Sequence, residues 1–168
     1  MAESTTISIA DIEHFKKQLL VWANHFRVVC LLDSNCYPLD KFRTKEWLLA
    51  VDAVEELPCG DNAFEKLKAF QTKNAATIFG FFTYDLKNQI ERLQSENLDA
   101  IGFPDLYFFK PRYVFEIAAN KLTVNRNYPE TFELVERIKQ QKLYEDESAS
   151  ALQLKSRTAK TNYLENVN

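Results

Sequence analysis

Apolar residues recur along the chain with two periods, one typical of helices and one typical of strands. Over residues 8–25 they are spaced three and four apart, which predicts an amphipathic helix with one buried face. The residues of that face are Ile12, Phe15, Leu19, Trp22 and Phe26. Asp11 is the expected N-cap, with His14 three residues later. Further helices are predicted over residues 61–73, capped by Asp61, and over 86–94 and 129–143.

Short β-branched and aromatic runs predict the strands. They cover residues 27–32, 46–54, 75–84, 106–110, 112–118 and 121–125. The first and third of these are expected to be buried, and residues 55–60 are expected to interrupt the pattern because they contain Pro58 and Gly60. Ala119-Asn120 is the expected tight hairpin turn. The order of elements predicts an α+β fold with mostly antiparallel β-sheets, sandwich-like, and helices packed on them.

The character of the chain changes after Tyr144. Residues 145–158 have few large apolar side chains and mixed charge, which is typical of a linker. Residues 159–168 then begin a new helical period with Tyr163 and Leu164, consistent with either a frayed tail or the start of another domain. We therefore expect a domain over residues 1–144, a linker over 145–158 and the beginning of a second domain over 159–168.

Composition narrows the classes of function. The chain has 168 residues, of which 46% are hydrophobic and 13% aromatic, so it can form one hydrophobic core. A net charge of −3 without a basic cluster argues against nucleic-acid or membrane partners, and no apolar run approaches the roughly 20 residues of a membrane span. Three cysteines without a CxxC pair predict reduced thiols in a cytoplasmic protein.

The usual catalytic signatures are absent from the sequence. His14 and His25 are eleven residues apart on the same expected helix, too distant to chelate one metal ion. There is no glycine-rich phosphate loop, GxSxG or HExxH motif. We therefore expect neither catalytic residues nor a bound cofactor in this chain.

A first candidate site lies where the strand over 27–32 ends. Leu32 is followed by Asp33 and Ser34, whose carboxylate and hydroxyl can bind the amine of a small polar ligand if they are partly desolvated. The alternative is that both residues form an Asx-type turn leaving the strand.

A second candidate is Gly80 with Tyr84 and Asp85. Gly80, inside a strand, indicates a close backbone approach or a bulge. Tyr84 is expected to bury its ring, and Asp85 to cap the helix over 86–94, so both roles are structural.

A third candidate is the aromatic run that includes Phe108 and Phe109. Adjacent residues of a strand face opposite sides. Either this domain's own helices cover both faces, or one face docks on another domain or subunit.

Two segments of the chain resemble the amino-terminal domain of component I of the chorismate-utilising synthases. They are residues 78–93, with Gly80, Tyr84-Asp85, Lys87 and Glu91, and the pair Pro104-Asp105. That family comprises aminodeoxychorismate (para-aminobenzoate) synthase of folate biosynthesis and anthranilate synthase of tryptophan biosynthesis. The resemblance implies a non-catalytic domain, followed after residue 168 by a chorismate-binding domain. It also implies that the intact enzyme aminates chorismate with Mg²⁺, using ammonia from a glutamine amidotransferase subunit.

The resemblance also gives the first candidate site a ligand. Leu31-Leu32-Asp33-Ser34 is similar to the Leu-Leu-Glu-Ser element that lines the tryptophan pocket of anthranilate synthases. Asp33 is shorter than glutamate by one methylene, about 1.5 Å. Arg43 and Lys45 are the candidates for the basic residue that follows. The shorter Asp33 favours aminodeoxychorismate synthase. The alternatives are the tryptophan-regulated domain of anthranilate synthase and a stand-alone small-ligand-binding module.

Overall fold

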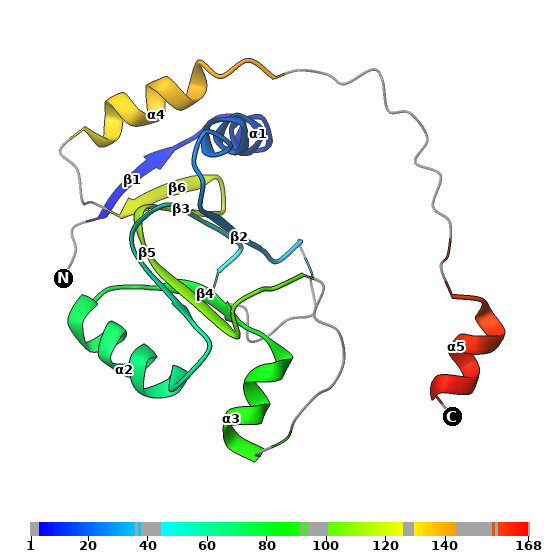
Figure 1. The fold of residues 1–168 in the computed structure, drawn as a ribbon. Coiled ribbons are helices and arrows are strands. Elements are labelled where there is room, and N and C mark those ends of the chain that lie inside the picture. Colours follow the sequence, from blue (N-terminus) through cyan, green and yellow to red (C-terminus); the bar gives the residue numbers. More distant parts are fainter. Residues whose placement is uncertain are drawn as a thin grey trace.

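The computed structural model describes residues 4–35, 37, 45–91, 93, 101–125, 130–143, 156 and 158–167 (Figure 1). Its strands are β1 (Ser4–Ser8), β2 (Val29–Asp33), β3 (Trp47–Cys59), β4 (Phe79–Phe82), β5 (Leu106–Ala118) and β6 (Lys121–Asn125). Its helices are α1 (Ile12–Ala23), α2 (Ala63–Asn74), the 3-10 turn η1 (Tyr84–Lys87), α3 (Asn88–Glu91), α4 (Thr131–Lys139) and α5 (Lys160–Val167). The expected α+β class is confirmed.

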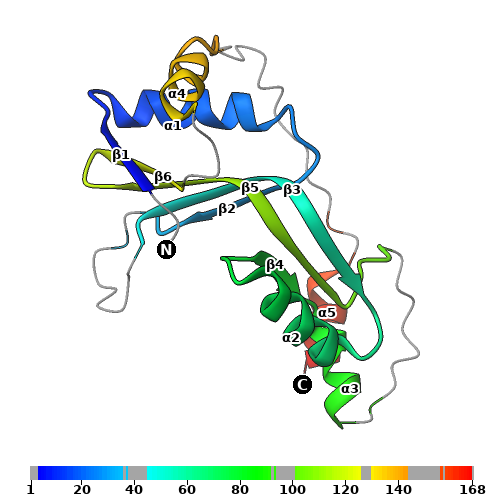
Figure 2. The same ribbon diagram turned by 90° about the vertical axis from the view of Figure 1, so that its left-hand side faces the viewer.

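The two long strands β3 and β5 form the spine of one antiparallel sheet. Its order is β1-β6-β5-β3-β2, and β4 pairs with β5 outside this path. Because β3 takes one edge of β5 along nearly its whole length, β4 and β6 share the other edge. A register shift between Ala53 and Glu55 follows the left-handed backbone of Asp52 (φ 65°). The spine bends in this region, so that the sheet has an upper half, which contains β1, β2 and β6, and a lower half, which contains β4 (Figure 2).

The upper half of the sheet packs against α1 and α4. Asp11 caps α1 by accepting a hydrogen bond from the backbone N–H of His14 at 2.9 Å, which confirms the prediction for this helix start. The predicted helix face is also confirmed: Phe15, Leu19 and Trp22 are buried, and Ile12 and Phe26 pack against the same cluster. This cluster, with the sheet residues Trp47 and Phe115 among others, is the main core.

Two smaller clusters follow the bend. One joins the halves of the sheet, with Ala50 and Val114 from the upper half and Phe79 and Phe109 from the lower half. The described strands form a single bent sheet, and the sandwich-like arrangement of sheets expected from the sequence is not seen among them. The other cluster holds α2 and η1 against the lower half through Ala63, Leu86 and Leu106, among other residues.

Several expected boundaries are wrong. Residues 55–59 continue β3 instead of breaking it, because β5 pairs with them. Pro58 is tolerated because β2 pairs with β3 only as far as Val51, so the other edge beyond carries no strand in the described chain. The two strands expected over 106–118 are one, β5, and the strand β1 was not expected at all.

Burial and capping bring further corrections. The strand expected to be buried over 27–32 is β2, an edge strand on which Leu32 is 55% exposed. Asp61 does not cap α2: the cap position is Asn62, and Gln89 accepts from the N–H of Ala63 at 3.0 Å. Most of the predicted linker lies outside the described residues.

Candidate functional site

The residues of the first candidate site lie where β2 ends and β3 begins. The Asp33 carboxylate accepts a hydrogen bond from the N–H of Asn35 at 2.7 Å. This bond forms the Asx-type turn that was the alternative to a ligand-binding role. The N–H of Ser34 donates to the carbonyl of Glu46 at 2.9 Å and extends the ladder. The Asp33 carboxylate is therefore engaged locally, on the surface.

Lys45 comes to the same end of the sheet but turns to another partner. Its ammonium lies 2.5 Å from the Glu116 carboxylate on β5. Arg43, the other basic candidate, lies outside the described residues. The structure thus brings Leu32, Asp33, Ser34 and Lys45 to neighbouring strand ends. These residues do not line any of the four cavities described for the chain.

Gly80 lies at the opposite end of the sheet, and its predicted close backbone approach is confirmed. It pairs with Phe108 across the β4–β5 ladder. A methyl group at Gly80 would lie 2.0 Å from the carbonyl oxygen of Tyr107 and 2.7 Å from the Cα of Phe108. Both are backbone atoms, so glycine is needed for contact between the two strands.

The expected roles of Tyr84 and Asp85 are wrong. Tyr84 is 83% exposed, and the ammonium of Lys87 lies 4.3 Å from its ring centroid, a cation–π contact at the surface. The cap position of η1 is Thr83, so Asp85 lies within the turn, with its carboxylate 3.3 Å from Lys87. Because the chain forms a 3-10 turn before α3, the cap falls two residues earlier than the sequence indicates.

Aromatic side chains are exposed around this motif. The aromatic patch consists of Phe81 and Phe103, which are 40% and 66% exposed. Phe82 and Tyr84 are also exposed (52% and 83%), but Phe82 follows Phe81 on β4 and faces the opposite side, where it contacts Phe108. Phe81 contacts Phe103 with ring centroids 5.9 Å apart. These are large apolar groups at the surface, of the kind that contact other molecules.

The strand β5 beneath the patch is covered by the chain's own residues. Phe108 and Phe109 face opposite sides, as predicted. Phe108 packs in the cluster that holds α2 and η1 against the lower half, and Phe109 packs in the cluster that joins the two halves of the sheet. The domain itself therefore covers both rings, but helices cover only the side of Phe108, and the side of Phe109 packs against other parts of the sheet. The exposed rings belong to β4 and its neighbours instead.

A polar network lies behind the aromatic patch. The hydroxyl of Tyr107 donates to the Glu56 carboxylate at 2.8 Å, and Arg27 forms an ion pair with the same carboxylate. Burial, followed by the hydrogen bond to Glu56, raises the pKa of Tyr107 to about 12. Tyr107 therefore stays protonated over the physiological range and acts here as a hydrogen-bond donor.

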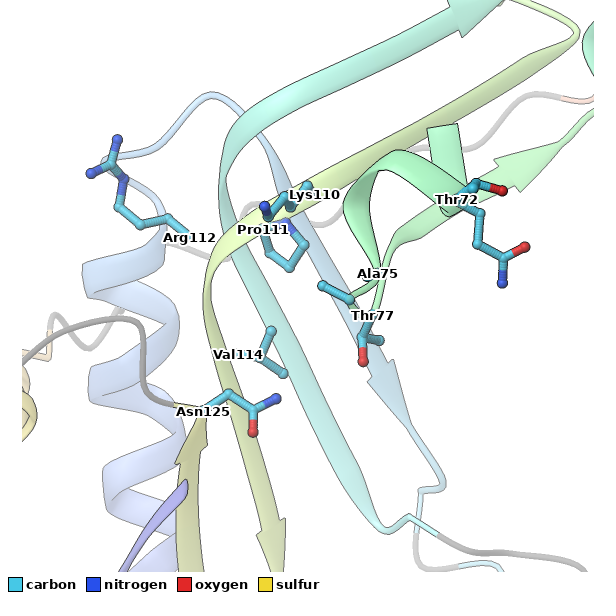
Figure 3. Close-up of a pocket in the computed structure, with 10 residues that line it drawn as sticks. Thr72, Ala75, Thr77, Lys110, Pro111, Arg112, Val114 and Asn125 are labelled. Atoms are coloured by element: carbon cyan, nitrogen blue, oxygen red, sulfur yellow. The ribbon is translucent and has the colours of Figure 1, made fainter. Parts of the chain in front are cut away.

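A cavity of about 800 Å³ lies beside β5, at a place that no motif indicated (Figure 3). Its lining comes from the end of α2 and the connection to β4, from the middle of β5, and from the end of β6. The described lining residues are Gln71, Thr72, Ala75, Ala76, Thr77, Lys110, Pro111, Arg112, Val114 and Asn125. These residues are far apart in the sequence and share no spacing, so sequence reasoning had no signal for them.

Metal and membrane features are not seen in the described part of the chain. There, His, Cys, Asp and Glu do not form groups of three or more that could hold a metal ion. Nor do any of the described helices combine the length and apolarity needed to cross a membrane. A scan against protein-family models and a search of curated proteins find no match to this chain.

Proposed function

We propose that this chain is the non-catalytic, amino-terminal domain of component I of aminodeoxychorismate synthase. In that role it docks on a chorismate-binding domain and on a glutamine amidotransferase subunit. The proposal comes from the resemblance at Gly80, Tyr84-Asp85 and Pro104-Asp105. The observation that carries it is the aromatic patch, which presents apolar surface next to the motif residues.

The charged groups near the motif support a docking role more than a catalytic one. Asp85 lies beside Lys87, and Asp61 forms an exposed ion pair with Lys66 at 2.7 Å. Such surface pairs contribute little energy and are not desolvated as catalytic groups usually are. The resemblance implies that the Mg²⁺ of the intact enzyme would be bound by the chorismate-binding domain.

The anthranilate synthase alternative, with a tryptophan-regulated pocket, is less well supported. Its site needs Asp33 to meet an ammonium group, whereas Asp33 is engaged in a turn and Lys45 pairs with Glu116. A thermal-shift assay with millimolar tryptophan separates the two readings. A ligand at 100 times its dissociation constant stabilises a protein by roughly 2.7 kcal/mol, so a clear rise in Tm would favour the regulated domain.

The proposed function is tested first on the native protein. We expect the protein isolated from its own cells to have a mass well above 19.6 kDa. The excess should correspond to roughly 250 further residues, the size of another large domain. A native mass of 19.6 kDa would contradict the proposal and favour a stand-alone binding module.

A reconstitution assay tests the docking surface. The chain is added to a separately purified chorismate-binding domain and a glutamine amidotransferase, and glutamine-dependent amination of chorismate is measured. We expect the chain to raise the rate and Phe81→Ser to abolish the increase. Phe64→Ser is the matched control, because Phe64 is also exposed (42%) but lies on α2 outside the patch. Equal activity of the two variants would exclude the patch as the docking surface.

A further inference from the structure

The cavity beside β5 arises from the topology of the sheet. On the edge of β5 away from β3, β4 pairs as far as Phe109 and β6 pairs from Phe115 onward. Residues 110–114 between these ladders have no strand partner on that edge in the described chain. The connection from α2 to β4 passes beside this gap, so the gap is a hollow with walls on two sides (Figure 3).

The floor of the cavity is apolar and its rim is polar. Pro111 and Val114 are buried on the β5 side, and the methyl groups of Ala75 and Ala76 lie opposite. Around them are the neutral polar side chains of the rim. These are Gln71, Thr72, Thr77 and Asn125. A ligand held here would contact hydrocarbon over part of its surface and find hydrogen-bonding groups at its edge.

The cavity carries an excess of positive charge. None of its described lining residues is acidic. Lys110 lies across the ladder from Glu55, but the carboxylate of Glu55 forms its ion pair with Lys73 at 2.6 Å. The hydrogen bond from Lys73 chiefly lowers the pKa of Glu55, and Lys110 adds a smaller charge effect. Two ammonium groups thus share one carboxylate, which leaves one positive charge beside the cavity.

The second cation of the lining is directed elsewhere. The Nε of Arg112 donates to the Asp52 carboxylate at 2.6 Å, and Figure 3 shows its side chain turned away from Ala75, Thr77 and Val114. Lys110 is therefore the group that gives the cavity its unbalanced charge.

From these features we infer that the cavity binds a small organic carboxylate with an apolar body. Lys110 meets the carboxylate, while Pro111, Val114 and Ala75 contact the hydrocarbon part. The volume of about 800 Å³ lies within the range of about 300–1,000 Å³ usual for small-molecule sites. Inorganic phosphate would leave the apolar floor unused and would find one unbalanced cation. This inference concerns the chain by itself and does not depend on the proposed role in a synthase.

The experiment is a titration followed by the amide resonances of the isotope-labelled chain. Hexanoate is the probe, 1-hexanol its uncharged analogue, and phosphate an anion without an apolar body. We expect hexanoate to shift the amides of Thr77, Val114 and Asn125 saturably. Hexanol and phosphate should produce much weaker shifts, and added salt should weaken hexanoate binding.

Variants identify the residues responsible. Lys110→Gln is expected to weaken hexanoate binding by about two- to fivefold, the range of a partly exposed ion pair. Lys121→Gln is the matched control, since Lys121 is also a strand lysine but does not line the cavity, and it should bind like the wild type. Ala76→Phe places a ring in the hollow from an exposed position and should abolish the shifts.

Three results would overturn the inference. They are the absence of saturable shifts at these amides, equal shifts with phosphate, and unchanged hexanoate binding by Lys110→Gln.

Discussion

Gly80→Ala is the substitution whose effect follows most directly from the structure. The added methyl group would lie 2.0 Å from the Tyr107 carbonyl oxygen, where ordinary contacts begin near 3.4 Å. Relief of this contact requires β4 to move away from β5 by about 1.4 Å, because neither backbone atom in its way can rotate aside. A displacement of this size is incompatible with the four-pair ladder between β4 and β5.

Two estimates of the energy agree. Insertion of a methyl group into a packed site costs about 1–3 kcal/mol. Displacement of β4 instead uncovers Phe79, now 5% exposed, and full burial of a phenylalanine contributes about 1.5–3 kcal/mol. We expect the free energy of unfolding to fall by about 2–3 kcal/mol. With a urea m-value of about 2 kcal/mol/M, the midpoint falls by roughly 1 M.

The assay is urea denaturation followed by the fluorescence of Trp22 and Trp47, which both lie in the main core and report global unfolding. Gly60→Ala is the matched control. A methyl group at Gly60 meets no atom within 4 Å, so its effect should stay within about 0.5 kcal/mol. If the two variants had the same midpoint, the close approach of β4 and β5 at Gly80 would be refuted.

The remaining predictions concern caps, a strained residue and one titrating group. Asp11→Ala removes an observed cap and should destabilise the protein by about 0.5–2 kcal/mol, whereas Asp85→Ala should change stability by less than about 0.5 kcal/mol; similar urea midpoints for the two variants would contradict the cap assignments. Ala75→Gly should stabilise the protein by up to about 1 kcal/mol, because Ala75 ends α2 with φ 35°, a left-handed backbone that costs a side chain about 1–2 kcal/mol, and glycine loses part of this gain through its greater conformational entropy; a lowered Tm would count against this reasoning. The raised pKa of Tyr107 predicts that stability is fully present below pH 10, the ordinary tyrosine pKa, and falls as the pH rises towards 12, because the unfolded chain loses this proton first. Tyr107→Phe should flatten part of that alkaline decline, and a decline identical to that of the wild type would exclude Tyr107 as a contributor.

Local features of this protein could be predicted because their causes lie within a few residues. The helix start at Asp11 depends on an N–H only three positions away. The hairpin at Ala119-Asn120 depends on two residues that adopt positive φ, here 47° and 60°. The buried face of α1 follows from helical spacing alone. The antiparallel α+β class follows from the order of the helices and strands.

Features that depend on distant partners were not predictable in this way. Residues 55–59 read as a break but extend β3, since β5 pairs with them from about fifty positions away. Tyr84 was expected to be buried, yet it follows β4 at the surface, outside the cluster that holds α2 and η1 against the sheet. Asp33 was consistent with either a ligand site or a turn, and its 2.7 Å contact with the N–H of Asn35 shows the turn.

The cavity shows most clearly the difference between features that follow from the local sequence and features that depend on distant parts of the chain. The sequence indicated most of the strands, although not β1 and not the continuity of β5, because burial patterns and turn residues act over short distances. The pairing of β4 and β6 with one edge of β5, which leaves residues 110–114 between them, depends on contacts between segments far apart in the chain. That arrangement brings Lys110, Ala75 and Asn125 around one hollow, although no local interaction of the chain joins them.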